Sequence, residues 1–312
     1  VSFVFMWIAA LVPPQLLMRL AVPIYTIGVA LLIAVFMFGI IKKGSRRWLH
    51  IGIDIQPSEI MKIAMPLMLA WYFQQRAGVV KWSSFLVAAV LLAIPVGMIQ
   101  LQPDLGTSLL VLASGMYVIF LAGLSWKAIA GLVVAFFASL PVAWSLMHDY
   151  QRDRVMTLID PTADPLGKGF HILQSIIAIG SGGISGKGWL HGSQAHLEFV
   201  PEATTDFVFA VFAEEFGLVG ILVLLFMYLL LIGRGLMIAA NAANLFSRLL
   251  AGAISMIFFT FVFINMGMVS GILPVVGVPL PFLSYGGTAL MTLGLCLGIL
   301  MSIQRHRKLV QT

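Results

Sequence analysis

Acidic residues are scarce in this sequence, with only twelve Asp and Glu among 312 residues. Charged residues make up 10% of the chain, whereas they make up about a quarter of a typical soluble domain. Together with 61% hydrophobic residues and a mean hydropathy of +1.05, this shortage excludes a soluble protein and predicts a polytopic membrane protein. The net charge of +6 therefore fits Lys and Arg beside anionic lipid headgroups better than nucleic-acid binding.

Several kinds of site are missing as well. The single cysteine, Cys296, excludes a disulfide framework and a cysteine metal site. The six histidines form no H-E-x-x-H pattern, which argues against zinc, and no G-x-S-x-G nucleophile motif occurs. The glycine cluster 180–188 fails as a nucleotide-binding loop, because Ser181 replaces a required glycine and Lys187 is followed by Gly188 instead of Ser or Thr.

Long apolar runs are present instead, and about 20 helical residues are enough to cross a hydrocarbon core of about 30 Å. Residues 1–12 read as the tail of a span without an initiator Met, so we expect a chain truncated at its N-terminus. The sequence predicts an all-α helical bundle with nine spans, the first of them partial, at about 1–12, 21–41, 57–73, 83–101, 105–123, 126–147, 207–233, 249–273 and 287–304.

The connections between these spans fall alternately on two faces. Lys and Arg are divided almost evenly between the faces, but all twelve acids lie on face B or in helices entered from it. We therefore expect face A to be cytoplasmic and the chemistry to lie on face B, outside the membrane. The long insertion 148–205 is expected to be a functional, partly helical loop there. Face B comprises 42–56, 101–105, 148–206 and 273–286.

Five of the acids lie within one segment at the start of an apolar run: Glu198, Glu202, Asp206, Glu214 and Glu215. Asp206 is either a first-turn capping residue or a partly desolvated carboxylate that acts as a general base. Glu214 and Glu215 follow about 12 Å deeper along a helix. They are either a costly pair in hydrocarbon or, if 217–233 spans alone, a structural anchor above the bilayer.

Further candidates are charged residues near the ends of other spans. Glu59 and Lys62 share one helix face, where they form a mutual salt bridge or bind an anionic ligand through the ammonium group. Asp104 is explained most simply as compensation of a helix dipole, and it is also, like Glu198 and Glu202, a candidate substrate-binding residue. Arg47 and Arg154 belong to basic clusters that are either solvated loops or, because a guanidinium matches phosphate oxygens, a site for a phosphorylated lipid headgroup.

Hard oxygen ligands are also available for a divalent cation. Asp206 and Glu198 could hold Mg²⁺ or Mn²⁺ beside a diphosphate. Glu202 is a candidate support for such a site or for the loop around it. No organic cofactor is expected.

Five motifs in order along nearly the whole chain resemble the SEDS family (shape, elongation, division and sporulation). They are QPDLGTS at 102–108, HDYQRDRV at 148–155, DPLGKGFHILQS at 164–175, LEFVPEATTDF at 197–207 and PLPFLSYGG at 279–287. Two further stretches, at 188–193 and 270–279, are similar to the rod-shape branch of the family more than to its division branch.

The resemblance implies a ten-span peptidoglycan glycosyltransferase that polymerises lipid II at the outer face of the bacterial cytoplasmic membrane. It implies that Asp206 is the essential aspartate, that Glu59 lies in a functional Pro-Ser-Glu motif, and that Ser284, within the last motif, binds substrate. It further implies a class B penicillin-binding protein as the transpeptidase partner, and MreC and MreD as elongation partners.

From these residues we expect an inverting transfer with Asp206 as the base and without a covalent enzyme intermediate. Arg47, Lys62, Arg154 or a divalent cation would stabilise the diphosphate leaving group. Two alternatives stay open. A lipid II flippase would need a polar path across the membrane, supported only by Glu214 and Glu215, and a scaffold for the penicillin-binding protein would need no chemistry at all.

Overall fold

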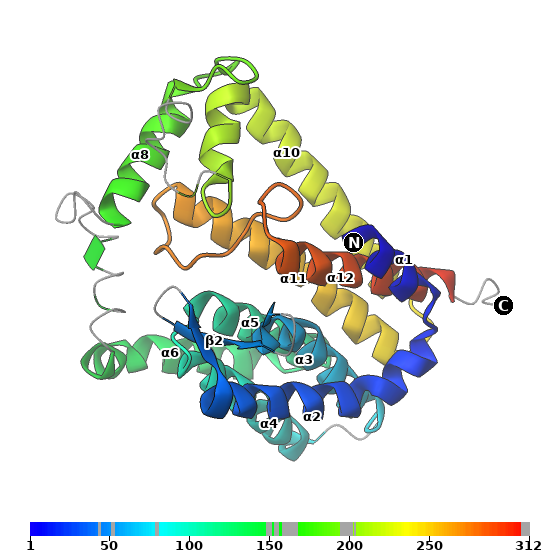
Figure 1. The fold of residues 1–312 in the computed structure, drawn as a ribbon. Coiled ribbons are helices and arrows are strands. Elements are labelled where there is room, and N and C mark those ends of the chain that lie inside the picture. The colour runs from blue at the N-terminus through cyan, green and yellow to red at the C-terminus, as the bar shows by residue number, and fades with distance from the viewer. Residues whose placement is uncertain are drawn as a thin grey trace. The chain divides into compact units, whose positions relative to one another are not determined.

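The protein is a helical membrane protein with one small antiparallel sheet. The computed structural model describes residues 1–42, 45–50, 54–78, 81–147, 152, 156–157, 168–193, 202 and 204–306. Its elements, labelled in Figure 1, are α1 (Ser2–Leu11), α2 (Pro14–Phe38), β1 (Ile40–Lys42), β2 (Ser45–His50), β3 (Asp54–Ile55), α3 (Pro57–Gln74), α4 (Trp82–Gln100), α5 (Leu105–Leu121), α6 (Trp126–Leu146), α8 (Lys168–Ser181), α10 (Val208–Ala240), α11 (Leu245–Val269) and α12 (Gly287–Arg305).

Each predicted span overlaps a helix, and the bounds differ by at most seven residues, at the start of α2 (14 instead of 21) and the end of α10 (240 instead of 233). Among the described residues, five helices are long and apolar enough to cross a membrane: α2, α4, α10, α11 and α12. How many of the other helices also cross it stays a prediction. The expected helical part of the long insertion is α8, which begins two residues before the apolar stretch at 170–180.

The chain divides into two compact units. Unit 1 comprises Val1–Leu124, Leu231–Thr260 and Gly287–Thr312, and unit 2 comprises Ser125–Leu230 and Phe261–Gly286. Helices α10 and α11 therefore contribute residues to both units.

In unit 1, α1 packs along α12, and α3 packs against α2 and α5. Close approach is possible because Gly298 of α12 faces the backbone of α1, where a Cβ would come within 2.3 Å of the Met6 carbonyl oxygen. Proline supports two helix starts, since Pro14 and Pro57 stand in first turns that leave N–H groups unpaired. Helix α3 contacts α2, α4, α5, α12 and β2, so most of its side chains are buried.

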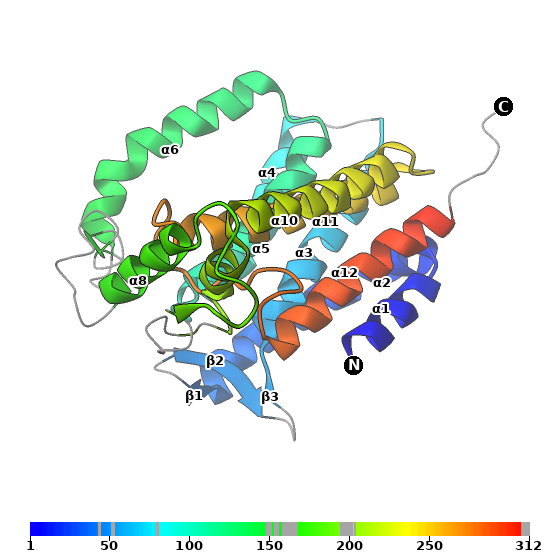
Figure 2. The same ribbon diagram turned by 90° about the horizontal axis from the view of Figure 1, so that it is seen from above.

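The sheet lies between α2 and α3 in the sequence and was not predicted. Strand β2 pairs antiparallel with β1, with Ile40 opposite Trp48, and with β3, with Leu49 opposite Ile55. Figure 2 shows the three strands together at one end of α2 and α3. Part of the expected basic loop at 42–56 is therefore a strand, which fixes the position of Arg47.

In unit 2, α8 packs against the end of α11, where Ser175 Oγ donates to the Val269 carbonyl at 3.0 Å. Helix α10 is broken at Gly217, which has φ 62° and ψ −162°, and the ribbon changes direction there (Figure 1). A Cβ at this glycine would lie 2.3 Å from the Gly186 nitrogen, so only glycine fits the bend. The break separates a short segment, 208–216, from a segment at 218–240 that is long enough to span.

Candidate functional site

Asp206 lies in a turn directly before α10, and the turn is held through its backbone. Three successive carbonyl groups each accept a hydrogen bond from a later part of the chain. Tyr285 N donates to the Thr204 carbonyl at 2.7 Å. Ser284 Oγ donates to the Thr205 carbonyl at 2.6 Å. Asn265 Nδ2 donates to the Asp206 carbonyl at 2.8 Å. The backbone of the aspartate is therefore fixed by α11 and by the turn before α12.

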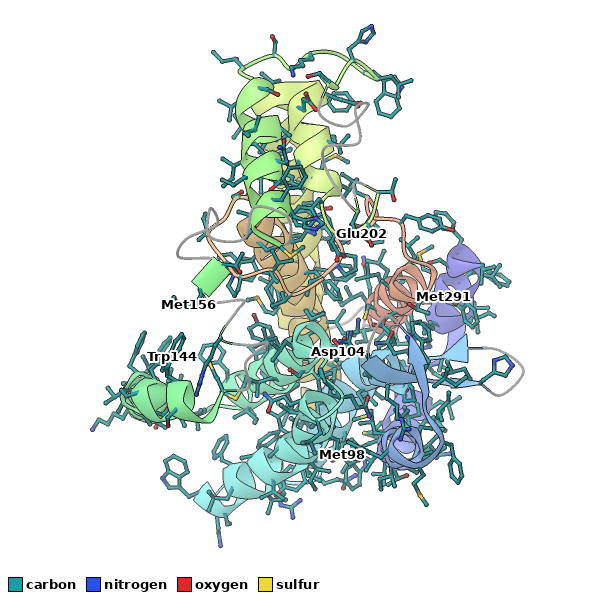
Figure 3. The ribbon with its side chains drawn as sticks, turned by 60° about the vertical axis from the view of Figure 1, so that its left-hand side comes forward. Met98, Asp104, Trp144, Met156, Glu202 and Met291 are labelled. Atoms are coloured by element: carbon teal, nitrogen blue, oxygen red, sulfur yellow. The ribbon has the colours of Figure 1, made fainter. Side chains whose placement is uncertain are left out.

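Glu202 closes the same turn from its N-terminal side. Its carbonyl accepts from Thr205 N at 3.0 Å and from Phe207 N at 3.3 Å, and its carboxylate accepts from Thr205 Oγ1 at 2.8 Å. Phe207 is buried and stacks on His171 of α8, with the ring centroids 5.8 Å apart. Figure 3 labels Glu202 in this turn. These contacts stabilise the loop, which is one of the two roles predicted for Glu202. The other role, support of a cation site, stays a prediction.

Ser284, predicted to bind substrate, is buried and bonded within the protein. Its hydroxyl donates to Thr205 and accepts from Leu280 N at 2.7 Å. The serine thus ties the last sequence motif to the Asp206 turn. Substrate contact by this residue stays a prediction, whereas its contact with the turn is observed.

The glycine cluster and Glu214 form one structure around the break in α10. The Glu214 carboxylate is fully buried, and its Oε1 lies 2.6 Å from Lys187 Nζ. Ser181 and Ser193 also donate to this oxygen, at 3.3 and 3.1 Å. These contacts compensate the buried charge, and whether the acid lies in hydrocarbon or above the bilayer stays a prediction.

Backbone contacts complete this clamp, which consists of 181–193 and 214–219. Lys187 N donates to the Glu214 carbonyl at 3.0 Å, and Gly188 N donates to the Glu215 carbonyl at 2.9 Å. Beyond the break, Leu218 N and Val219 N donate to carbonyls of the glycine cluster. The clamp thereby satisfies backbone groups that a broken helix leaves without helical partners.

In unit 1, α3 carries a buried ion pair at its first two turns. Lys62 Nζ lies 2.6 Å from Glu59 Oε1, and the lysine side chain is only 3% exposed. Thr292 of α12 donates to Glu59 Oε2 at 3.2 Å. The predicted salt bridge is confirmed, and Thr292 joins it as a partner that sequence reasoning missed.

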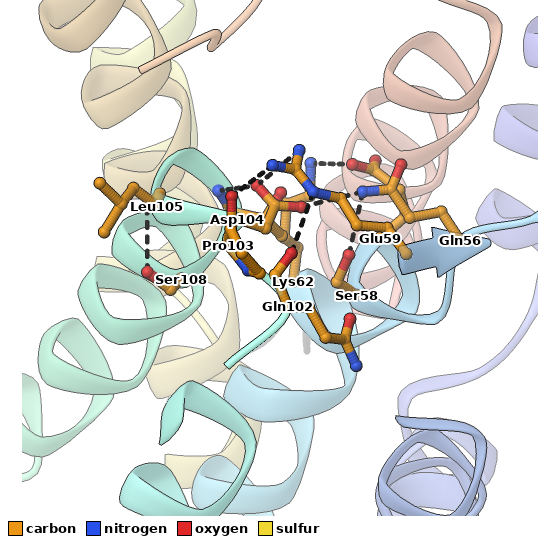
Figure 4. A network of polar contacts seen from close by, with 11 residues as sticks. Gln56, Ser58, Glu59, Lys62, Gln102, Pro103, Asp104, Leu105 and Ser108 are labelled. Atoms are coloured by element: carbon orange, nitrogen blue, oxygen red, sulfur yellow. Dashed lines mark hydrogen bonds and ion pairs between the residues drawn. The ribbon is translucent and has the colours of Figure 1, made fainter. Parts of the chain in front are cut away.

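Asp104 is the N-cap of α5 and the centre of a second group of contacts, drawn in Figure 4. Its Oδ1 accepts from Thr107 N at 3.2 Å, and its Oδ2 accepts from Gln56 Nε2 at 3.0 Å. Arg47 Nη1 lies 3.6 Å from Asp104 Oδ1, and the same guanidinium group donates to the carbonyls of Gln102 and Pro103. The helix-end interpretation of Asp104 is confirmed, and Arg47 joins strand β2 to the start of α5.

The structure thus gathers the predicted residues into two groups. Unit 1 holds Arg47, Glu59, Lys62 and Asp104, which together with Gln56 and Thr292 are called the charge network below. Unit 2 holds Glu202, Asp206 and Ser284.

Arg154 and Glu198 lie outside the described residues. Asn265, Thr292 and Lys187 were missed. Asn265 and Thr292 carried a signal, since each is an uncharged polar residue inside an apolar run, whereas the contact of Lys187 with Glu214, 27 residues away in the sequence, carried none.

No group of three or more His, Cys, Asp or Glu side chains that could hold a metal ion occurs in the part of the chain that the structure describes. Of the two predicted ligands, only Asp206 lies there. One or two carboxylates with phosphate oxygens are the usual ligands of Mg²⁺ at diphosphates, and the cation expected at Asp206 and Glu198 stays a prediction.

Comparison with known proteins decides the family. A family model for FtsW, RodA and SpoVE, described as a cell cycle protein, matches residues 1–309. The chain belongs to this family. It is the SEDS family that the five motifs predicted, and the membership confirms the helical membrane fold.

Relatives in the SEDS family carry the names of enzymes. The chain is 55% identical to peptidoglycan glycosyltransferase MrdB of Escherichia coli K12 over 311 residues, which are 99% of this chain and 84% of the relative. It is 39% identical to the probable peptidoglycan glycosyltransferase FtsW of Geobacter metallireducens, over 92% of this chain and 78% of the relative.

Solved SEDS structures have the same fold. The Thermus thermophilus rod shape determining protein RodA superposes with a TM-score of 0.72 at 29% identity, covering 98% of this chain and 84% of that chain. A chain from a solved peptidoglycan synthase complex superposes with a TM-score of 0.83 at 34% identity, covering 99% of this chain and 88% of that one.

Proposed function

We propose that this protein is a peptidoglycan glycosyltransferase that polymerises lipid II during cell elongation, with Asp206 as general base. The observation that carries the proposal is the fixed turn around Asp206 in a SEDS family member. Hydrogen bonds to the carbonyls of Thr204, Thr205 and Asp206 hold the backbone of the aspartate in one place, which gives its carboxylate the fixed starting point that a base in proton transfer needs.

In the proposed reaction, Asp206 takes the proton from the 4-hydroxyl of the acceptor sugar on one lipid II. That oxygen attacks the anomeric carbon of a second glycan, a glycosidic bond forms, and undecaprenyl diphosphate leaves with the bonding electrons. A single displacement inverts the anomeric centre, from the α-linked diphosphate to a β-linked glycan. The diphosphate is a good leaving group, so charge stabilisation matters more than a general acid.

The cations of the charge network are candidates for that stabilisation. Lys62 and Arg47 lie against Glu59 and Asp104. These acids orient the two cations, and an incoming diphosphate would have to compete with them. Arg154 is a third candidate. If Mg²⁺ or Mn²⁺ takes part, Asp206 and Glu198 would hold it, and it would neutralise charge on the diphosphate.

The proposed setting follows from the family and the substrate. We place the protein in the bacterial cytoplasmic membrane with face B, and hence Asp206, outside. A class B penicillin-binding protein would crosslink the new strands, and MreC and MreD would be further partners. The similar chain from a peptidoglycan synthase complex, in which polymerization and crosslinking are coordinated, supports a partner of this kind.

The test is lipid II polymerisation by the purified protein with its penicillin-binding partner. Asp206→Asn is expected to lower the rate at least about 100-fold, because general-base catalysis contributes about 10²–10⁴-fold. Glu202→Gln is the matched comparison, since it removes a charge from the same turn and keeps an acceptor for Thr205 Oγ1. Its loss should stay below about tenfold. A wild-type rate in Asp206→Asn would rule out the base.

The two alternatives are weaker than this proposal. The flippase rested on Glu214 and Glu215, and Glu214 is engaged by Lys187, Ser181 and Ser193 in a clamp. The scaffold predicts that cells carrying Asp206→Asn keep their rod shape. Spherical cells that still assemble the complex would support the enzyme.

A further inference from the structure

Asn265 is a fully buried amide in the otherwise apolar last nine residues of α11, 261–269. A polar side chain in such surroundings is costly unless it is hydrogen-bonded. Its Nδ2 carries two hydrogens, and it donates to the Asp206 carbonyl and to the Val278 carbonyl, both at 2.8 Å. One amide therefore links two separate stretches of backbone.

The second stretch lies beside the Asp206 carboxylate. Gly277, the neighbour of Val278, has a left-handed φ of 73°, and a Cβ at this position would lie 3.3 Å from Asp206 Oδ2. The backbone of 277–278 thus forms one side of the space around the carboxylate. By holding Asp206 and Val278 together, the Asn265 amide sets the distance between the carboxylate and that backbone.

The other bonds to the turn do not replace this contact. Tyr285 and Ser284 bind the carbonyls of Thr204 and Thr205, which precede the aspartate. In the part of the chain that the structure describes, the two hydrogen bonds from the Asn265 amide join the Asp206 carbonyl to the backbone of 277–278.

We propose that Asn265 is a positioning residue for the Asp206 carboxylate, which it holds at a fixed distance from the 277–278 backbone. The inference rests on the proposed function of Asp206 as the base. A displacement of about 1 Å at a reacting group can lower a rate about 100-fold, so a residue that never touches substrate can control the reaction.

Asn265→Leu keeps the approximate size of the side chain and removes both donors. In the lipid II assay with the penicillin-binding partner, we expect kcat to fall about 30- to 100-fold while KM changes less than about threefold. The matched control is Ser255→Ala. That serine is buried in the same helix and donates only to Ala251, one turn earlier, so its loss should change kcat less than about threefold.

A double variant separates positioning from a structural role. If Asn265 acts through the carboxylate, Asn265→Leu should cause no further loss in an Asp206→Asn background, because residues that act as a unit are not additive. An equal further loss in that background would show a structural role and overturn the inference. If Asn265→Leu does not assemble with the partner, Asn265→Ser replaces it, since one hydroxyl cannot donate to both carbonyls.

The outcomes for the inference and for the proposed function differ. A near-wild-type rate in Asn265→Leu with an inactive Asp206→Asn would overturn the positioning role and leave the base in place. A near-wild-type rate in both variants would overturn the base itself. A loss in both, with no further loss in the double variant, supports the inference.

Discussion

Ion pairs between side chains build the charge network of unit 1, whereas hydrogen bonds to backbone carbonyls hold the Asp206 turn of unit 2. In the network, Lys62 contacts Glu59 and Arg47 contacts Asp104, so cations and carboxylates compensate one another inside the protein. In the turn, three carbonyls are bonded and the Asp206 side chain is half-buried.

The difference separates two roles of charged residues, binding with stability and catalysis, that cannot be told apart in the sequence. The compensated cations yield to an anionic ligand only by exchange. Thr292 joins α12 to α3 and Arg47 joins β2 to the start of α5, so the network suits binding and stability. In the Asp206 turn, the main chain carries the structural hydrogen bonds, so the Asp206 side chain can serve in the reaction. Substitutions should therefore change stability most in the network and activity most in the turn.

The largest stability effect is expected at Lys62. Lys62→Met leaves the Glu59 carboxylate without its cation at a site that is only 14% exposed, and we expect a cost of about 3–5 kcal/mol. Glu59→Gln/Lys62→Met removes both charges and should recover at least half of that loss. Equilibrium unfolding in mixed detergent micelles measures both variants. If the single and double variants lost the same free energy of unfolding, the two charges would not be coupled. The charge network would then not differ from the Asp206 turn in the way described.

The clamp around Gly217 offers a sharper comparison, because it places an ion pair within unit 2. Glu214 is fully buried, whereas the Lys187 side chain is 30% exposed. Lys187→Met, which leaves a buried carboxylate, should therefore cost about 3 kcal/mol, and Glu214→Gln, which leaves an accessible ammonium, about 1 kcal/mol. The same unfolding measurement ranks them. The reverse order would mean that the buried acid is not held as a carboxylate.

Much of the fold follows from apolar run length, since this property alone located the helices. The sheet at 40–55 was missed because its basic residues come in adjacent pairs, at 42–43 and 46–47, instead of alternating with apolar ones, and because β pairing depends on contacts that no local pattern reveals. The break at Gly217 was missed for a similar reason. A glycine inside an apolar helix is common, and only the fold of 182–188 against it shows why it is needed.

The candidate site divides in the same way. Charge scarcity made Asp206, Glu59, Lys62 and Asp104 visible, because ionisable groups near membrane spans are expensive. Asn265 carries no charge, and its role depends on two backbone carbonyls that come from distant parts of the sequence. Backbone acceptors leave no mark on a sequence, so a site built on them needs the fold.

A small effect is expected at Ser284, whose hydroxyl ties the last motif to the Asp206 turn. Ser284→Ala leaves Leu280 N and the Thr205 carbonyl without this partner, and we expect a cost of about 1–2 kcal/mol. Ser114→Ala is the control, because that buried serine donates only to Val111 within its own helix and should cost less than about 1 kcal/mol. Polymerisation should fall less than about tenfold in Ser284→Ala, since the bonds to Thr204 and Asp206 remain. A loss as large as that of Asp206→Asn, at unchanged stability, would instead favour direct contact of Ser284 with substrate.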